Sequence, residues 1–271
     1  MIDLSFFRQM WQRIHEDEVP ALAAQLAYFF LLSLFPLLIF LVTLVPYLPI
    51  NEGDILGFFD DFAPGETMAL IETSLADIMK RDGKLLSFGI IATLWSASNG
   101  INAIVRAFNK AYRVEETRSF IVSRGMAIIL TFAMIFVFLV ALILPVFGKE
   151  IGILLFAQFG LSEEFITIWN TFRWVISILI LFIVFLGLYW IAPNKKITCK
   201  SGVPGTIFAT AGWVFVSLGF SYYVSNFGAY TSTYGSIGAI IVLMIWLYLS
   251  AYIIIIGGEI NAYFSERKKG C

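Results

Sequence analysis

Six long apolar stretches constrain this sequence more than any other feature, because each is long enough to cross a membrane as a single helix. The hydrocarbon core of a bilayer requires roughly 20 consecutive apolar residues in helical form. Only 14% of the 271 residues are charged, against about 25% in soluble domains. We therefore predict an all-α integral membrane protein with one membrane domain over residues 1–271. Its six transmembrane helices are expected at about 21–47, 85–107, 124–147, 172–192, 203–225 and 236–260.

The lysines and arginines predict how these helices are oriented. With six spans, most of the 18 basic residues fall on the side that holds both termini and the loops 108–123 and 193–202. Cytoplasmic segments are enriched in such residues, so we expect both termini to be cytoplasmic. Residues 1–19 are expected to contain an interfacial amphipathic helix, and the external loops 48–84 and 148–171 are expected to contain short helices. In the interfacial helix the apolar face is formed by Leu4, Phe7, Trp11 and Ile14, with Arg8 and Arg13 beside it.

Several classes of function find little support in the sequence. A net charge of −1 argues against nucleic acid as a partner, because nucleic-acid binding requires a basic surface. The single histidine, His15, and the two cysteines, Cys199 and Cys271, are too few for a His/Cys metal cluster or a disulfide framework. No Ser/His/Asp or Cys/His catalytic set can form within the membrane from these residues. We predict no catalytic residues, no metal and no cofactor, and membrane lipids as partners.

The second span carries a polar stripe that sets it apart from the others. Five polar residues recur at alternating spacings of three and four, which places them on one face of a helix: Asn99, Asn102, Arg106, Asn109 and Arg113. Such a face must meet protein or water, because polar groups exposed to lipid are costly. Two interpretations remain open here. The amides could hydrogen-bond to neighbouring helices within a packed bundle, or the stripe could line a cavity.

The last span ends with "IIIIGGEINAYF", which places Glu259 and Asn261 after a long uncharged run. Two interpretations of Glu259 are open: its carboxylate is solvated at the membrane interface, or it lies within the protein. Gln25, Arg106 and Glu259 lie near the expected cytoplasmic ends of spans one, two and six, and therefore at similar depth. We therefore predict a cluster of Gln25, Asn102, Arg106, Glu259 and Asn261, in which Arg106 pairs with Glu259 because buried ionised groups are usually paired.

Two further segments are candidates for gating. Pro36 lies inside the first span and should kink it near Ser33, because proline removes a backbone donor. The uncharged loop before the last span, "SNFGAYTSTYGSIGA", contains Tyr230, Tyr234 and Gly235. This loop is typical of a tight turn with interfacial aromatic residues. It is also compatible with unwound backbone beside a cavity.

Small residues predict close packing in the fifth span. Gly205, Ala209 and Gly212 follow one another at spacings that place them on one face of that helix. Faces of this kind allow helix backbones to approach closely within a membrane. The contact partner could be another helix of the chain or a second copy in a homo-oligomer.

Segments along the whole chain resemble the YihY/virulence factor BrkB family, whose members were formerly mislabelled ribonuclease BN. The matching segments include "AAQLAYFFLLSLFPLLIF" (23–40), "NGINAIVRAFNKAYRVEETRSF" (99–120), "LYWIAPNKK" (188–196), "YTSTYGSIGAIIVLMIWLYLSAY" (230–252) and "GGEINA" (257–262). The resemblance implies a six-helix protein of the bacterial plasma (inner) membrane, and it leads us to expect alanine where Gly258 stands. The family motif positions carried onto this chain are Gln25, Tyr28, Ser33, Pro36, Asn109, Tyr112, Arg118, Tyr234, Gly235, Glu259 and Asn261.

Three functions compete for this sequence. The polar stripe, Glu259 and the residues at the candidate gates favour a transporter, or a flippase or exporter for an anionic amphiphile or lipid. The sequence contains no G-x-x-x-x-G-K-[ST] phosphate-binding motif, so ATP is not expected to drive it. The alternative is a membrane scaffold or envelope-assembly protein that transports nothing. An enzyme, including a ribonuclease, is the least supported.

Overall fold

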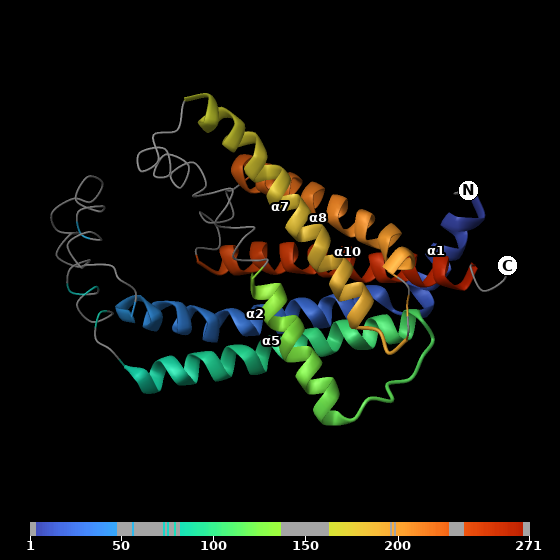
Figure 1. Ribbon diagram of the computed structural model, residues 1–271, viewed down its shortest axis with the longest axis horizontal. Helices are drawn as coiled ribbons and strands as arrows, with labels where there is room; N and C mark the ends of the chain where they lie inside the picture. Colours follow the sequence, from blue (N-terminus) through green and yellow to red (C-terminus); the bar gives the residue numbers. More distant parts are fainter. Residues whose placement is uncertain are drawn as a thin grey trace. The chain divides into compact units, whose positions relative to one another are not determined.

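The computed structural model describes residues 4–47, 56, 73, 75, 79, 82–136, 163–195, 197, 199–227 and 236–267. Within these residues the elements are helices and turns, and no strand occurs. The elements shown in Figure 1 are α1 (Leu4–Glu16), α2 (Val19–Leu44), the 3-10 turn η1 (Val45–Tyr47), α5 (Gly83–Ala111), α7 (Glu163–Ile191), α8 (Cys199–Phe227) and α10 (Ser236–Arg267). A shorter apolar helix spans Phe120–Phe136.

Five of the described helices are long and apolar enough to cross a membrane: α2, α5, α7, α8 and α10. They confirm the all-helical membrane class. The remaining expected span, 124–147, begins within Phe120–Phe136, and its second half lies outside the described residues. The count of six spans and the cytoplasmic termini therefore stay predictions.

One of the two loops that we expected to be external, 148–171, differs from the expectation. Most of the loop 48–84 lies outside the described residues, as does 148–162. Residues 163–171, which we expected in a short helix of the second loop, instead belong to α7. The helix pattern of this loop thus continues into the following span without a break.

The chain divides into two compact units, Phe29–Ala97 and a larger one formed by Met1–Tyr28 and Ser98–Cys271. In the smaller unit α5 begins directly after Asp82, whose carboxylate accepts hydrogen bonds of 3.0 Å from the backbone N–H groups of Lys84 and Leu85. This is an N-cap, which satisfies donors that have no partner within the helix. Further along α5, a Cβ on Gly89 would lie 3.0 Å from the backbone of Phe40, so α2 and α5 are in close contact there.

In the larger unit, α8 packs against α7 and α10. A Cβ on Gly205 would overlap the carbonyl oxygen of Gly257, so the backbones of α8 and α10 touch at this point. The hydroxyl of Tyr189 on α7 donates a 2.7 Å hydrogen bond to the carbonyl of Ile254 on α10. The small-residue face predicted for the fifth span is therefore confirmed as a contact surface within the chain, and Ala209 on it is fully buried.

Helix α1 packs on α10 through a face that the sequence pattern did not single out. Met10 is buried with Ile260 and Tyr263, and Phe6 packs against this cluster. Phe7 and Trp11, expected on the membrane-facing apolar side, have exposed fractions of 65% and 68%. The helix thus has two apolar faces, one packed against protein and one exposed. Ile14, which we grouped with Phe7 and Trp11, belongs to the face that packs on α10.

The end of α5 is fixed by a C-terminal turn. Arg113 has a φ of 52°, and the following residue, Val114, donates a 3.0 Å hydrogen bond to the carbonyl of Asn109. Arg113 itself donates to Lys110 at 3.0 Å. These two bonds form a Schellman motif, which terminates helices by satisfying their last carbonyls. The turn directs the chain into the loop 112–119, which forms part of the candidate site.

Candidate functional site

The polar stripe of α5 serves two purposes in the structure. Asn109 is buried, and it binds Glu116 and residue 194 of the loop after α7. Asn99 accepts a 3.0 Å hydrogen bond from Arg124 of the helix Phe120–Phe136. These two amides therefore act as contacts between segments of the chain. Asn102 is half-buried and Arg106 is exposed, and neither has a hydrogen bond or ion pair that we find within the described residues.

Asn102 and Arg106 instead line a cavity of about 270 Å³ in the larger unit. The cavity is open to the outside and lies between α5 and the segment that leads into the helix Phe120–Phe136. Its lining residues include Asn102, Arg106, Asn109, Glu116, Phe120 and Arg124. Within the α5 stripe, Asn99 therefore contacts protein, Asn102 and Arg106 line the cavity, and Asn109 does both.

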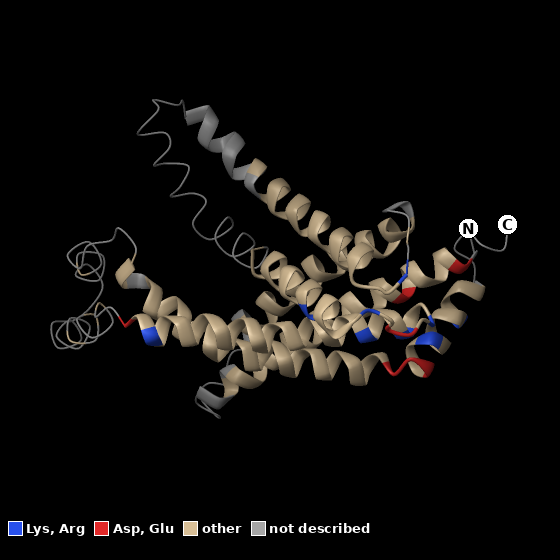
Figure 2. Cartoon of the chain, turned by 60° about the horizontal axis from the view of Figure 1, so that its bottom comes forward, with Lys and Arg blue, Asp and Glu red and all other residues tan. Residues whose placement is uncertain are grey.

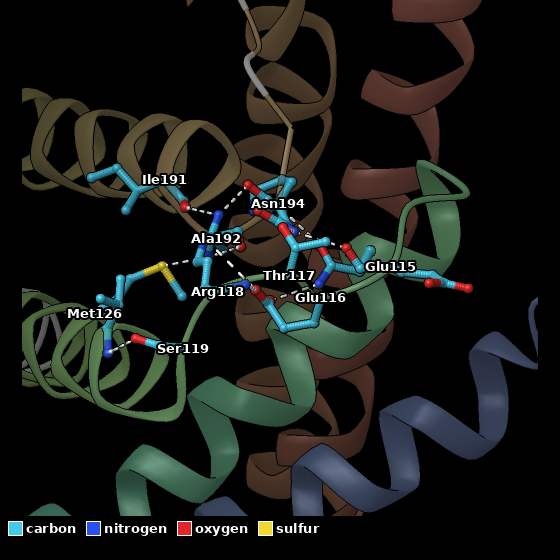
Figure 3. Close-up of polar contacts among 12 residues, drawn as sticks. Glu115, Glu116, Thr117, Arg118, Ser119, Met126, Ile191, Ala192 and Asn194 are labelled. Atoms are coloured by element: carbon cyan, nitrogen blue, oxygen red, sulfur yellow. Dashed lines mark hydrogen bonds and ion pairs between the residues drawn. The ribbon is translucent and has the colours of Figure 1, made fainter.

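A network of hydrogen bonds closes one side of this region (Figure 3). The guanidinium of Arg118 donates to the carbonyls of Ile191 at 3.3 Å, Ala192 at 3.1 Å and Pro193 at 2.5 Å. These are the last carbonyls of α7 and of the turn behind it, which have no partner within the helix. A basic side chain at a helix C-terminus also interacts favourably with the helix dipole. Arg118 thus joins the loop after α5 to the end of α7.

Asn194 completes the network from the other side. Its backbone N–H donates a 2.7 Å hydrogen bond to Oδ1 of Asn109, while the Nδ2 of Asn109 donates to Glu116 at 2.9 Å. The side chain of Asn194 donates to Thr117 and to the carbonyl of Glu115, both at 2.8 Å. Both the oxygen and the nitrogen of the buried Asn109 amide are therefore hydrogen-bonded, which fixes this side chain in the wall of the cavity.

Glu259 and Asn261 are both fully buried within the protein. Interfacial solvation of Glu259 is therefore excluded. Asn261 accepts a 2.7 Å hydrogen bond from the backbone N–H of Gly205, next to the close contact of α8 and α10. Nη1 of Arg13 lies 3.5 Å from Oε2 of Glu259, and the other terminal nitrogen of Arg13 contacts Glu266.

The predicted pair of Arg106 and Glu259 is wrong, because Arg13 is the basic group beside Glu259. Arg13 is only 8% exposed, whereas we expected it on the surface of an interfacial helix. Gln25, predicted in the same cluster, is exposed. The polar residues thus form two groups, one around Glu259 and one around the cavity of Arg106.

Within the described residues, ion pairs of Arg13, Lys110 and Arg113 lie near the start of α2 and the end of α5. Besides the buried contact of Arg13, Lys110 lies 3.0 Å from Glu18, and Arg113 lies 3.8 Å from Glu16. Figure 2 shows charged residues concentrated in the larger unit near the chain termini.

Tyr112 lies directly after α5 and is 3% exposed. Burial raises the pKa of its hydroxyl well above the usual range, and the negative charge of Glu259 raises it further. The hydroxyl has no hydrogen-bond partner within the described residues. The Nζ of Lys195 lies 4.9 Å from the centre of its ring, which is a cation–π contact.

The candidate gating residues fall into two sets. Pro36 lies inside α2, and the hydroxyl of Ser33 donates a 2.7 Å hydrogen bond to the carbonyl of Phe30. Both belong to the smaller unit. Tyr230, Tyr234 and Gly235 lie outside the described residues. A gating role for either set stays a prediction.

Reasoning from the residues missed Arg13 and Arg118, together with the cavity residues Glu116, Phe120 and Arg124, and the first two had a signal. Arg13 follows Phe6 and Met10 at spacings that place it on their helical face, which a second apolar face would have revealed. Arg118 was named only because the family resemblance includes it, and its position shortly after a helix end was compatible with binding the last carbonyls of a helix. No group of three or more His, Cys, Asp or Glu side chains suited to a metal ion occurs within the described residues.

Comparison with known proteins places the chain in a family. The family described as "Virulence factor BrkB" matches residues 10–270. The chain belongs to the BrkB family. This BrkB-family protein is 55% identical to the ribonuclease-like protein YfkH of Bacillus subtilis over 267 residues, which cover 98% of the chain and 97% of the relative. It is 31% identical to a UPF0761 membrane protein of Vibrio campbellii over 98% of the chain and 83% of that relative. No solved structure matches.

Gly258 is the position where the family resemblance led us to expect alanine. In the structure a Cβ on Gly258 would lie 2.6 Å from the ring of Phe108. This distance is too short for a carbon–carbon contact, so Phe108 would have to shift to admit a methyl group. In this BrkB-family protein, Gly258 therefore allows α10 to approach the end of α5 closely.

Proposed function

We propose that this BrkB-family protein moves an anionic amphiphile across the bacterial plasma membrane without using ATP. The observation that carries this proposal is the cavity of about 270 Å³ lined by Asn102 and Arg106, because a polar membrane stripe that is only packing would be covered by neighbouring helices. Arg106 and Arg124 supply positive charge. Phe120 supplies an exposed apolar side chain at the same cavity.

The source of the driving force follows from what the sequence contains. Because it has no G-x-x-x-x-G-K-[ST] motif for ATP, movement would be passive or coupled to a gradient. Glu259 is the buried acid best suited to gradient coupling, since ionisable groups within membrane helices commonly mark proton and ion relays. We also propose that the chain is not a ribonuclease or other enzyme. The ribonuclease-like name belongs to its Bacillus relative.

The direct experiment is lipid movement in reconstituted vesicles. Purified protein is incorporated with a trace of fluorescent phosphatidylglycerol, and added dithionite reports how fast inner-leaflet label reaches the outside. We expect faster movement than in protein-free vesicles, and slower movement with Arg106→Gln. Fluorescent phosphatidylcholine is the matched control for headgroup charge. Equal rates with and without protein, for both labels, would contradict lipid movement.

Water access to the cavity is a second test of the same proposal. Asn102→Cys and its buried neighbour Ala103→Cys are each made after Cys199 and Cys271 have been replaced by serine. A charged, membrane-impermeant thiol reagent should label residue 102 in native membranes and leave residue 103 unlabelled, because Ala103 is only 2% exposed. Absence of labelling at 102 until denaturant is added would mean that the cavity is dry.

A scaffold that transports nothing is the second candidate. It is favoured by the backbone contact of Gly205 with Gly257 and by the amide contacts of Asn99, Asn109 and Asn261. These contacts fix helices relative to one another and need no substrate. A dry cavity together with no lipid movement would favour this scaffold.

A further inference from the structure

Two arginines from different helices meet at the cavity. Arg106 comes from the last turns of α5, and Arg124 comes from the first turns of the helix Phe120–Phe136. Nη1 of Arg124 donates a 3.0 Å hydrogen bond to Oδ1 of Asn99, which orients the Arg124 guanidinium toward α5. Planar guanidinium groups match the oxygens of phosphate, and they bind it with charge-assisted hydrogen bonds.

The acid that shares the cavity is already engaged elsewhere. Glu116 accepts hydrogen bonds from Nδ2 of Asn109 at 2.9 Å and from the backbone N–H of Arg118 at 3.1 Å. Nε of Arg118 lies 3.8 Å from its carboxylate. Arg118 therefore offsets the charge of Glu116. The positive charges of Arg106 and Arg124 leave the cavity suited to an anion.

The surroundings of the cavity favour an amphiphile over a small soluble anion. Phe120 lines the cavity, and both Phe120 and the adjacent Ile121 are 80% exposed. Side chains of this kind, at the start of an apolar helix, suit contact with acyl chains. A volume of about 270 Å³ is slightly below that of pockets for drug-sized ligands, about 300–1,000 Å³, so it fits a headgroup and not a whole lipid.

From these observations we propose that Arg106 and Arg124 bind the phosphate of an anionic glycerophospholipid, whose headgroup enters the cavity while its acyl chains lie against Phe120 and Ile121. Basic pockets between membrane helices on the cytoplasmic side are known to bind such headgroups. The inference rests on the proposed function for the amphiphilic nature of the ligand. Binding itself is nevertheless measurable without transport.

Native mass spectrometry of the full chain in detergent tests the site, with phosphatidylglycerol as the probe and phosphatidylcholine as the zwitterionic comparison. Arg106→Gln and Arg124→Gln should each weaken phosphatidylglycerol binding about tenfold, because each removes charge-assisted hydrogen bonds. Asn99→Ala should weaken it less, since Arg124 loses only its orienting partner. Arg106→Lys retains the positive charge but lacks the planar guanidinium, so its affinity for phosphatidylglycerol should lie between those of Arg106→Gln and the parent.

The matched control is Arg113→Gln. Arg113 follows α5 closely and has an exposed side chain, but it does not line the cavity. If binding reflected only the general positive charge of this end of the protein, Arg113→Gln would weaken it as much as Arg106→Gln, and the proposal would be overturned. Equal binding of phosphatidylglycerol and phosphatidylcholine would overturn it as well. A circular-dichroism melt of each variant ensures that the folded protein is compared.

Two further measurements separate a lipid site from a site for soluble phosphate, and lipid binding from lipid transport. Inorganic phosphate and glycerol phosphate are added as competitors; displacement of the lipid at equal concentration would overturn the amphiphile assignment and indicate a site for soluble phosphate. Specific lipid binding without lipid movement in vesicles would support the site and contradict the transport proposal. Lipid movement that persists unchanged in an Arg106→Gln/Arg124→Gln double variant that has lost phosphatidylglycerol binding would support the binding site and overturn the proposed role of this cavity in transport.

Discussion

The guanidinium of Arg13 on α1 and the carboxylate of Glu259 on α10 form a buried ion pair, with 3.5 Å between Nη1 and Oε2. Arg13 also donates to the carbonyl of Ala111 at 3.3 Å and contacts Glu266. One side chain therefore joins α1, the end of α5 and α10. Its removal should weaken all three of these connections together.

Arg13→Met should destabilise the protein by about 3 kcal/mol, because it removes the buried contact with Glu259 together with those to Glu266 and the carbonyl of Ala111. Glu259→Gln should cost less, since Arg13 keeps Glu266 and the Ala111 carbonyl. The double variant should be more stable than the sum of the two single losses predicts. Unfolding midpoints in detergent measure these effects. Arg8→Met, an exposed position on the same helix, is the control, and an equal loss at Arg8 would contradict the prediction.

Gly205→Ala should strongly destabilise the fold, because its Cβ would overlap the carbonyl oxygen of Gly257 and would lie 2.6 Å from the side chain of Asn261. Forcing extra volume into such a contact costs about 1–3 kcal/mol or more. Gly219→Ala on the same helix is the matched control, since nothing lies within 4 Å of its Cβ. Size-exclusion profiles and thermal unfolding distinguish the two. Similar behaviour of both variants would argue against the helix contact.

Arg118→Ala should destabilise the end of α7 by about 2 kcal/mol, because several carbonyls lose a charged donor. Arg118→Lys should recover little of this loss. A lysine presents a single ammonium group, and it cannot reproduce the planar fork that reaches Ile191, Ala192 and Pro193. Limited proteolysis of the loop 112–119, together with thermal unfolding, measures the effect. Full rescue by lysine would mean that only the charge matters.

Tyr112→Phe should be neutral or stabilise the protein by up to about 1 kcal/mol at neutral pH. The reason is that the buried hydroxyl has no hydrogen-bond partner within the described residues. The ring contact with Lys195 is retained by phenylalanine. Unfolding by denaturant in detergent measures the change. A loss of more than about 1 kcal/mol would indicate that the hydroxyl is bound, since that is the usual net value of a hydrogen bond.

The same variant should alter the response to alkaline pH. Because the pKa of Tyr112 is higher in the folded protein than its unfolded value of about 10, the contribution of this group to stability is full below pH about 10. It is lost as the pH rises from there towards the folded value. In this range the parent should lose stability as the pH rises, and Tyr112→Phe should make this decline less steep by up to about 1.4 kcal/mol per pH unit. Identical slopes in parent and variant would contradict the burial of the phenol.

The sequence predicted those features that depend on a single helix. The apolar runs indicated the spans of α2, α5, α8 and α10 to within a few residues at most ends, because length and hydropathy decide insertion. The small residues around Gly205 predicted a close contact, because small side chains let helix backbones approach one another. Asn102 and Arg106 share a face in any α5 helix, so their presence at one cavity follows directly from spacing.

Relationships between distant segments could not be obtained in this way. If Glu259 lay within the protein a basic partner was expected, but helix depth alone did not decide between Arg106 and Arg13. Choosing between them required the rotation of α1, and that helix has apolar residues on two faces. The role of Arg118 depends on where the chain returns after α7, which no local pattern specifies.

The hydrogen bonds of Arg118 also have a consequence for the order of events during biosynthesis. Arg118 and Pro193 are 75 residues apart, and α7 lies between them in the chain. The carbonyls that Arg118 binds are absent until the ribosome has synthesised residues 191–193. Until then Arg118 lacks these carbonyl partners, and Asn109 lacks the backbone N–H of Asn194. The loop after α5 can therefore reach its final structure only after α7 has been synthesised.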